Sequence, residues 1–489
     1  MKKARYLLVG LVLMCGLGMQ AITPKTMITI GESMTLKLST LIYRGLPVVV
    51  VETDSAQLPT CDYVSAPAGC MGSTITNATK VPGRMVIYKR YGDIDSVVYD
   101  SGDYEKDISG MTIKIRGNTS AYDIKKPYKI KLQKKADLLC AGVDSIYKDK
   151  EWLLLRDDYL TTAAGFKVSE MLGMAWTPRH QFVNLVINGD YRGVYLLCEA
   201  VKRNPDCRLN VDKLSGYIFE CDPYWWNESA YVTSSAAPTY NYTFKYPDGD
   251  EILPEQLEYM QALVNDYEAS LANGTYPEMI DVASFAKWCL VHDIMGTQDA
   301  GGANRYYTKY DTTSQTKIVM PLAWDFDMAE RTTNDWSQSH TALMMNLFNS
   351  PNRAFVREFA DEWYRVRSTF LEDYLAFWDE FSASQEGNAM VSCYTYDKIV
   401  YNRGTLFSIT LNARRTWINN RYPWIDNMIT SMCPLGDLNT DGIVDVSDIS
   451  DLIDVLLTGS PRVRYIGDMD GNGVVDVSDA AILISTILG

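Results

Sequence analysis

The first part of the chain alternates apolar and polar positions with a period of two, the pattern of half-buried strands. Such runs, together with short β-branched runs, predict strands at 46–51, 84–89, 111–116, 128–132, 152–156, 182–187 and 191–199. The last two flank Asn188-Gly189-Asp190, a turn sequence that favours a hairpin. One helix is expected among them, at 158–174, so this region is predicted to be mainly β.

The later part of the chain repeats its apolar residues every three to four positions, which is the period of a helix. Helices are predicted at 254–272, 281–292, 353–381 and 411–429. Between the second and third of them, two strand-like runs at 305–310 and 317–323 are separated by turn-forming residues. We therefore expect an α+β protein in which a β-rich lobe precedes an α-rich lobe.

Acidic side chains flank this predicted hairpin. Asp299 and Asn304 precede it, and Trp324-Asp325-Phe326-Asp327 ends it. A hairpin would bring Asp299, Asn304 and Asp325 together, and alternation would put both Asp side chains of the final run on one face, with the aromatic rings inward. Such oxygen ligands suit Mg²⁺, and an Asp can orient an acceptor hydroxyl in phosphoryl transfer. The alternative is a capping or turn role for each Asp.

A basic segment precedes this acidic one. Eight basic residues and one acidic residue lie between Lys114 and Lys135. Most fit the solvated face of a hairpin, but Arg116, Lys126 and Lys129 are candidates for holding nucleotide phosphates. Glu199, at the end of an apolar strand, is either an exposed carboxylate or the partner of a cation in a cleft.

Residues 1–21 have the pattern of a secretory signal, with basic residues, an apolar run and Ala21 as the cleavage residue. The run is too short to span a membrane, so the mature chain is expected to be secreted or at a bacterial cell surface, without a membrane span. Residues 22–45 would form a leader or linker segment. Export permits disulfides, and Cys61 with Cys70 or Cys198 with Cys207 are close enough in sequence. Three histidines without ligand spacing argue against a zinc site or a His-based triad.

The net charge of −15 is concentrated in residues 435–489, which contain ten Asp, two Arg and no Glu or Lys. Such a cluster favours cation binding over nucleic acid. Two twelve-residue loops there have oxygen side chains at positions one, three, five, nine and twelve and Gly at six, the EF-hand spacing for Ca²⁺. Asp at position twelve is shorter than the usual bidentate Glu. The ligands would be Asp437, Asn439, Asp441, Asp445 and Asp448, then Asp468, Asp470, Asn472, Asp476 and Asp479.

Each loop precedes a helical pattern, and this duplicated loop-helix unit resembles the type I dockerin over 435–489. The resemblance implies a small all-α domain with two Ca²⁺ that attaches to a cohesin on a scaffold or cell-surface partner. Loop positions ten and eleven help to choose the cohesin in that family. The matching residues are Val446, Ser447, Val477 and Ser478.

The body of the chain, over about 46–430, resembles the spore coat protein H (CotH) family. The matching stretches are 46–50, 116–120, 126–129, 188–195, Glu199, the loop from Asp299 to Asn304, and 324–327. The resemblance implies an atypical protein-kinase-like fold that phosphorylates secreted proteins with ATP and Mg²⁺ or Mn²⁺. Asp299 would be the catalytic Asp and Asp325 the metal ligand, helped by Asn304 and Asp327. No His-Arg precedes the first Asp, and Asp327 stands where a kinase has Gly.

Two functions from different classes follow. The first is a secreted kinase, attached through its dockerin, that transfers the ATP γ-phosphate to a hydroxyl of an extracytoplasmic protein. The second is a non-catalytic adhesin or accessory component of a polysaccharide-degrading, cellulosome-like complex, in which the aromatic run Tyr224-Trp225-Trp226 would stack on a sugar. A glycosidase using Asp325 and Asp327 is weaker, because neighbours on one strand face cannot flank a bond from both sides.

Overall fold

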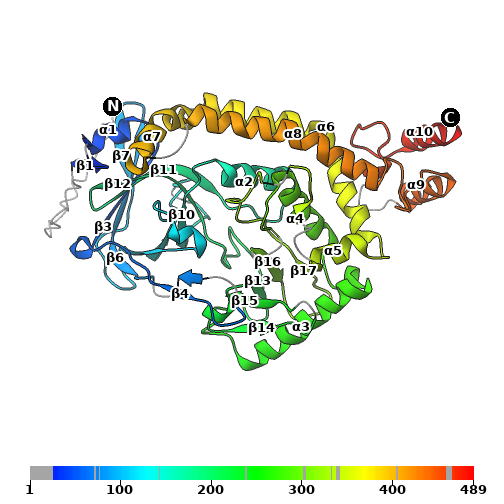
Figure 1. Cartoon of the computed structure of the whole chain (residues 1–489), viewed down its shortest axis with the longest axis horizontal. Helices are drawn as coiled ribbons and strands as arrows, with labels where there is room; N and C mark the ends of the chain where they lie inside the picture. Colours follow the sequence, from blue (N-terminus) through cyan, green and yellow to red (C-terminus); the bar gives the residue numbers. More distant parts are fainter. Residues whose placement is uncertain are drawn as a thin grey trace, which may run out of the picture.

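The computed structural model describes residues 26–489 apart from 33, 71–72, 76–77, 143, 237–238, 301–303, 332, 338–341, 403–405 and 459–464. The expected signal at 1–21 and the glycines at 301–302 therefore lie outside the described residues. The protein is mixed α and β, with a β-rich first part and a helical C-terminal part (Figure 1).

The first sheet closes on itself. Its order is β10 (Asp149–Leu155), β9 (Tyr128–Ala136), β8 (Met111–Ile115), β6 (Val81–Tyr91), β3 (Val48–Thr53), β11 (His180–Ile187), β12 (Asp190–Glu199), β1 (Met27–Ile30) and β2 (Met34–Lys37), with β7 (Ile94–Asp100) on β6. Because β10 also pairs with β12, the seven strands from β10 to β12 form a ring. Alternate side chains such as Ile113, Ile130 and Trp152 lie opposite one another and are fully buried. The period-two pattern of the sequence thus supplies the interior of the ring.

The C-terminal part of the chain is helical, as expected. A second sheet, of which the sequence predicted only two strands, accompanies these helices. Its order is β14 (Tyr231–Thr233), β15 (Asn241–Tyr246), β13 (Tyr217–Cys221), β16 (Arg305–Lys309) and β17 (Ile318–Val319). The predicted hairpin is present as β16 and β17, with Thr308 opposite Val319. Its second strand is two residues long, not seven, because Pro321 cannot donate to a ladder. A short hairpin of β4 (Tyr63–Ser65) and β5 (Ser73–Ile75) stands apart.

Ten α-helices are described. They are α1 (Leu38–Tyr43), α2 (Thr161–Met171), α3 (Pro254–Asn273), α4 (Val282–Met295), α5 (Ala342–Asn349), α6 (Ala354–Ala383), α7 (Gln385–Tyr401), α8 (Phe407–Met432), α9 (Val446–Thr458) and α10 (Val477–Leu488). The N-terminal end of α4 is capped by Asp281, which accepts the Ser284 N–H at 2.8 Å. The long helices α6 and α8 run side by side from the β-rich part to the C-terminal pair, α9 and α10 (Figure 1). None of the described helices has both the length and the apolar character that crossing a membrane requires.

The C-terminal segment packs against α6 through the short 3-10 turn Tyr465–Gly467, which lies between α9 and α10. The Ile466 N–H donates to the buried carboxylate of Asp361 on α6 at 3.0 Å. Leu438 and Ile466 are both buried as part of the main hydrophobic core. The segment predicted as a separate calcium-binding unit is therefore seated on the body of the protein through side-chain contacts.

The cysteines of the described residues are all free thiols. Neither pair that spacing allowed, Cys61 with Cys70 or Cys198 with Cys207, is bonded. Cys198 is buried on β12 in the main core, so its side chain is directed into packing rather than toward the loop that carries Cys207.

Candidate functional site

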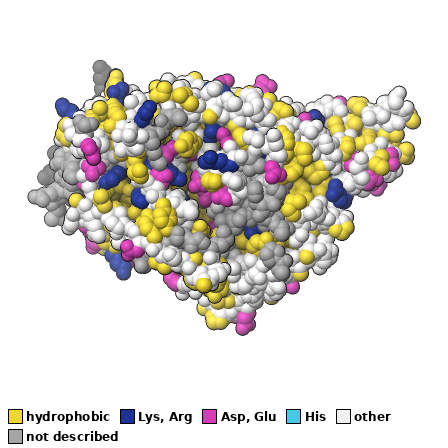
Figure 2. Space-filling view, in the orientation of Figure 1, with side chains coloured by type: hydrophobic (Ala, Val, Ile, Leu, Met, Phe, Trp, Pro, Cys, Tyr) yellow, Lys and Arg dark blue, Asp and Glu magenta, His cyan; other side chains and the backbone are white. Residues whose placement is uncertain are grey.

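A cavity of about 450 Å³ is lined by residues that follow β8 and β10 and by residues of the second sheet. It contains five of the residues that the sequence singled out: Arg116, Asp299, Asn304, Asp325 and Asp327. Figure 2 shows acidic side chains gathered near the middle of one face of the molecule, with basic side chains beside them. Segments nearly two hundred residues apart in sequence therefore meet at one place.

Backbone geometry turns two of these residues toward the cavity. Asn304 and Asp325 have φ of 64° and 66°, in the left-handed region. Asn and Asp tolerate that region better than other residues with a side chain, because their short polar groups bond locally. Such outliers gather at functional sites, where surrounding structure holds them in place.

Asp325 and Asp327 both line the cavity, but they do not lie on a strand, so the alternation that was used to predict a shared face does not apply to them. The strand ends at Val319, and Asp325 lies in an irregular segment. Trp324 and Phe326 are nevertheless buried, and their rings lie 5.7 and 6.1 Å from that of Phe166 on α2. Aromatic anchoring, rather than sheet pairing, places the two carboxylates in the cavity.

Close packing beneath the carboxylates requires a glycine on α2. A Cβ built on Gly165 would lie 2.4 Å from the ring of Phe326, which is closer than real atoms approach. The other side of the same ring stacks on His292 of α4 at 5.3 Å. Phe326 is thus fixed between two helices, and the backbone of Asp325 is fixed with it.

The three carboxylates disfavour one another's charge. Burial, reinforced by Asp327, raises the pKa of Asp299 to about 6. Burial raises the pKa of Asp325 well above its ordinary value, and Asp327 and Asp299 add to this while Arg116 opposes it. Oδ1 of Asp299 is buried and has no hydrogen-bond partner within the described part of the chain. An excess of hard oxygen donors with an unsatisfied atom fits a divalent ion such as Mg²⁺ or Mn²⁺.

A half-buried ion pair in the cavity was not predicted from the sequence. Nζ of Lys245 on β15 lies 2.8 Å from Oε2 of Glu220 on β13, and both side chains line the cavity. Burial alone would lower the pKa of Lys245, but Glu220, Tyr306 and Glu228 together outweigh burial and raise that pKa, so the ammonium stays charged. Each of the two is a charged residue within a short strand of mostly uncharged residues. That pattern in the sequence could have marked both as candidate site residues.

Arg156, also missed, joins two segments of the cavity wall. Its guanidinium pairs with Asp123 in the loop after β8 and lies 4.0 Å from Oδ2 of Asp327. It follows β10 directly. Arg156 therefore links the loop that follows β8 to the acidic segment 325–327.

Three other predicted residues do not reach the cavity. Nζ of Lys126 donates to the Ala121 carbonyl at 2.7 Å, and Lys129 pairs with Glu151 at 2.7 Å. Glu199 is fully buried; it accepts the Arg179 N–H at 3.0 Å, and its Oε1 lies 3.8 Å from Nε of Arg208. It is therefore not the exposed strand-end residue of the first alternative.

The two C-terminal loops repeat one hydrogen-bond pattern. The carboxylate of Asp437 accepts the N–H groups of Asp441 and Gly442, and that of Asp468 accepts those of Asn472 and Gly473, all at 2.9 to 3.1 Å. The first-position side chain therefore holds each loop in a tight turn. Both loops therefore have the same turn, which agrees with the repeated spacing of oxygen side chains in the sequence.

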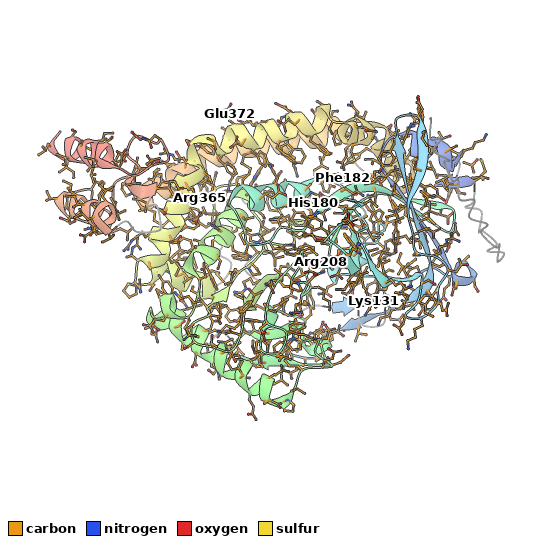
Figure 3. All side chains as sticks on the ribbon, turned by 180° about the vertical axis from the view of Figure 1, so that it is seen from behind. Lys131, His180, Phe182, Arg208, Arg365 and Glu372 are labelled. Atoms are coloured by element: carbon orange, nitrogen blue, oxygen red, sulfur yellow. The ribbon has the colours of Figure 1, made fainter. Side chains whose placement is uncertain are left out.

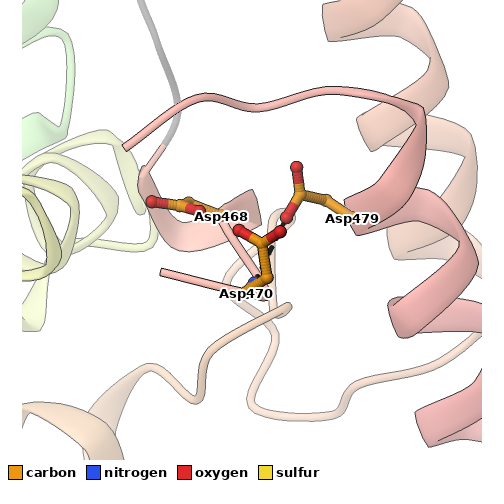
Figure 4. Close-up of side chains that lie close together, drawn as sticks. All are labelled: Asp468, Asp470 and Asp479. Carbon is orange, nitrogen blue, oxygen red and sulfur yellow. Dashed lines mark hydrogen bonds between the residues drawn. The ribbon is translucent and has the colours of Figure 1, made fainter. Parts of the chain in front are cut away.

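The second loop also brings carboxylates together. Asp468, Asp470 and Asp479 each offer an oxygen within 4.8 Å of the others. Figure 4 shows these three side chains gathered at the loop. Both oxygens of Asp479 accept loop N–H groups, from Met469 at 2.8 Å and from Asp476 at 2.8 Å. The shorter Asp at position twelve thus closes the loop onto the first turn of α10. Oxygen ligands in such a ring suit Ca²⁺.

The residues predicted to choose a partner begin the two C-terminal helices. Val446 and Val477 are 67% and 76% exposed, and Ser447 and Ser478 beside them are exposed too. The N–H of each Ser donates to the preceding Asp, Asp445 or Asp476, which caps the helix. Both equivalent surfaces are open to solvent.

Comparison with protein families gives two matches. Residues 113–382 match the CotH kinase protein family, and residues 435–488 match the type I dockerin domain. No curated protein matches the chain significantly. Both resemblances drawn from the sequence motifs are confirmed. Because the first match covers more than half of the chain, this protein belongs to the CotH kinase protein family, and it carries a type I dockerin domain after its CotH domain.

Proposed function

We propose that this protein is an extracytoplasmic kinase that transfers the γ-phosphate of ATP to a hydroxyl group of a protein. The observation that carries the proposal is the convergence of Asp299, Asp325 and Asp327 with Arg116 in one cavity. A cluster of half-buried carboxylates is unfavourable without a counter-cation, and a divalent ion with phosphate oxygens supplies one.

Separate roles follow from the environments of these residues. Asp299, with its pKa near 6, accepts the proton of the acceptor hydroxyl as the oxygen attacks the γ-phosphorus and the bond to the ADP oxygen breaks. Asp325 holds the metal ion, assisted by Asp327 and Asn304. When bound, Mg²⁺ or Mn²⁺ neutralises charge on the phosphate oxygens.

Cationic side chains of the cavity complete the proposed nucleotide site. Arg116 and Lys245 both line it and carry positive charge toward a triphosphate. We assign phosphate binding to these two residues rather than to Lys126 or Lys129, because the latter two do not line the cavity. Glu220 holds the Lys245 ammonium in position at 2.8 Å.

We further propose a two-lobed, kinase-like arrangement for residues 46–430, after a signal at 1–21 and a leader at 22–45. The closed sheet would be the first lobe, and the second sheet with α3 to α8 the second. The cavity is lined from both sides, as a nucleotide site between lobes would be.

Residues 435–489 would attach this domain to a partner outside the cell. Type I dockerin domains generally bind calcium, and the two loops here would take two Ca²⁺. The exposed residues Val446, Ser447, Val477 and Ser478 would contact a cohesin on a scaffold or cell-surface protein. Such attachment would place the protein in a secreted, cellulosome-like assembly.

The test is transfer of labelled γ-phosphate by the full chain, with Mg²⁺ or Mn²⁺, to itself or to casein. Asp299→Asn and Asp325→Asn should abolish incorporation, whereas Asp470→Asn, in the dockerin loop, should leave it unchanged. No transfer by the wild-type chain, together with no ATP binding, would contradict the kinase. It would favour a non-catalytic accessory component of a polysaccharide-degrading complex.

A further inference from the structure

A second cavity, of about 460 Å³, lies between α2, α6 and the beginning of β11. Its lining includes Lys167, Arg179, His180, Gln181, Leu139 and Phe377, and it shares no lining residue with the cavity described above. Figure 3 shows His180, seen from behind, below the long helix α6. The proposed kinase reaction uses none of these residues.

Arg179 offers an immobilised cation to this cavity. Its guanidinium lies over the ring of Tyr147, with 3.5 Å between the guanidinium carbon and the ring centroid. Nη1 is buried and has no hydrogen-bond partner among the described residues; its nearest carboxylate oxygen is Oδ1 of Asp137, at 4.0 Å. The Asp137 carboxylate already accepts the N–H of Leu139 and Ala141 and the hydroxyl of Ser145. Nη1 of Arg179 is therefore a buried donor without a hydrogen-bond acceptor among the described residues.

A second donor in the same wall is also unused. Nε2 of Gln181, two residues further along, is buried without a hydrogen-bond partner in the described part of the chain. A buried donor left without an acceptor is unfavourable, because it loses its hydrogen bond to water and gains none in return. Two such donors beside one cavity indicate that a bound ligand supplies the acceptor atoms for their hydrogen bonds.

The other charged and apolar groups are compatible with an anion that carries an apolar part. Nζ of Lys167 lies 5.1 Å from the ring centroid of Phe377 and only loosely near Glu170, at 3.7 Å. Glu170 is the single carboxylate in the lining, and its side chain is 54% exposed. Lys167 and Arg179 bring two positive charges to this wall. Glu170 and, behind Arg179, Asp137 oppose them, while Phe377 and Leu139 provide an apolar surface.

We propose that this cavity binds a small organic anion, with phosphate or carboxylate oxygens accepting from Arg179 and Gln181 and its apolar part against Phe377. A planar guanidinium can donate two parallel hydrogen bonds to either kind of anion. Lys167 adds a second positive charge near the entrance. This site is independent of the proposed nucleotide site, so either assignment can fail without the other.

The experiment is calorimetric titration of phenyl phosphate and, separately, benzoate into the full chain with calcium present. We expect at least one probe to bind at one site per chain, and the stronger of the two identifies the anion class. Arg179→Gln and Gln181→Leu should each weaken binding roughly tenfold or more, because each removes a donor. Lys131→Gln, an exposed basic residue on β9, is the matched control and should bind as the wild type does. Saturating ATP should leave the affinity unchanged.

Circular dichroism and thermal unfolding of each variant separate loss of binding from loss of fold. If Arg179→Gln unfolds, Lys167→Gln replaces it, because its side chain makes only a loose ion pair. Failure of both probes to bind at millimolar concentration would overturn the proposal. So would equal affinity of the wild-type chain and the folded Arg179 and Gln181 variants.

Discussion

The carboxylates of the dockerin loops and those of the cavity between the two sheets are brought together in different ways. In each dockerin loop a continuous segment of twelve residues supplies every oxygen side chain, and the first Asp accepts two N–H groups of its own loop. In the cavity, Asp299 and Asp325 come from separate segments, and Asp299 keeps an unpaired buried oxygen. The loop is organised by local hydrogen bonds and the cavity by distant packing.

This difference has consequences for electrostatics. A backbone N–H favours the charged form of the carboxylate that accepts it. Hydrogen bonds from Ser447 and Ser478 lower the pKa of Asp445 and Asp476. Burial and mutual repulsion raise the pKa of Asp299 and Asp325 instead. Asp437 is an exception in the dockerin, because burial raises its pKa and Asp448 and Asp441 add to this. Local hydrogen bonds thus favour the charged form of Asp445 and Asp476, whereas burial and repulsion prevail at the two cavity acids.

The largest expected effect is that of removing one cavity charge. Asp325→Asn should lower phosphoryl transfer by roughly a thousandfold, because the ligand charge that holds the metal is lost. Initial rates with saturating Mn²⁺ and ATP measure it. The same change at Asp470, in the dockerin, should alter the rate less than about twofold. A rate above a tenth of wild type for Asp325→Asn would break the proposed distinction between the two clusters.

The next effect tests whether aromatic packing holds the cavity acids. Gly165→Ala should destabilise the folded chain by about 1–3 kcal/mol, because its Cβ would overlap Phe326. In an ordinary helix interior the same change is stabilising by about 1 kcal/mol, so the sign is diagnostic. Urea unfolding measures the free energy. An unchanged or increased stability would show that Phe326 can move away without cost.

A buried histidine supplies a pH-dependent test of the same packing. Burial lowers the pKa of His292 to about 3, and neither ring nitrogen has a hydrogen-bond partner among the described residues. Below its ordinary pKa near 6.5, the unfolded chain takes up a proton that the folded chain does not, so stability falls as pH falls from 6.5 toward 3. At pH 5 this residue should cost about 2 kcal/mol relative to pH 7.

His292→Phe should remove that part of the pH dependence while keeping a ring against Phe326. Urea unfolding of both proteins at pH 5 and pH 7 gives the difference directly. The wild-type chain should lose more stability on acidification than the variant does. Equal losses would mean that His292 is protonated in the folded protein, contrary to its apolar surroundings of Trp288 and Phe326.

The smallest expected effect concerns the seat of the dockerin on α6. The Asp361 carboxylate accepts the N–H of Ile466, two residues before the second loop begins at Asp468. Asp361→Ala should weaken calcium binding at that loop by a few-fold, about 1 kcal/mol, because a buried donor loses its partner. Calcium titration measures this, with the exposed Glu372→Ala on α6 as the matched control. Identical affinities for Asp361→Ala and wild type would show that the two parts are not coupled.

Features encoded within short segments were accessible from the sequence. Alternation in 111–116 and 128–132 predicts strands that are present as β8 and β9, and helical spacing in 254–272 predicts α3 closely. The dockerin resemblance rests on residues within two twelve-residue loops, and the family match over 435–488 confirms it. In each case, the residues that predict the strand, helix or loop are the same residues that form it.

Features that depend on distant partners were not accessible. Lys245 and Glu220 pair only because β13 and β15 lie side by side in the second sheet, and neither of these strands was predicted from the sequence. Alternation predicted a longer strand than β17, since it takes no account of the proline at 321. The helix α7 was missed because its apolar positions do not follow a single face. Among the basic residues, Arg116 reached the cavity while Lys126 found a carbonyl nearby, and spacing alone could not separate them.

The most direct test of the central claim is the binding of Mn²⁺ and ATP to the full chain, measured by calorimetry with the dockerin saturated with calcium. Wild type, Asp325→Asn and Asp470→Asn are compared under the same conditions. The account predicts one Mn²⁺–ATP per chain for wild type and Asp470→Asn, and none for Asp325→Asn. Binding of Mn²⁺–ATP by Asp325→Asn with wild-type affinity, or its absence in the wild-type chain, would contradict the assignment of the cavity as a metal–nucleotide site.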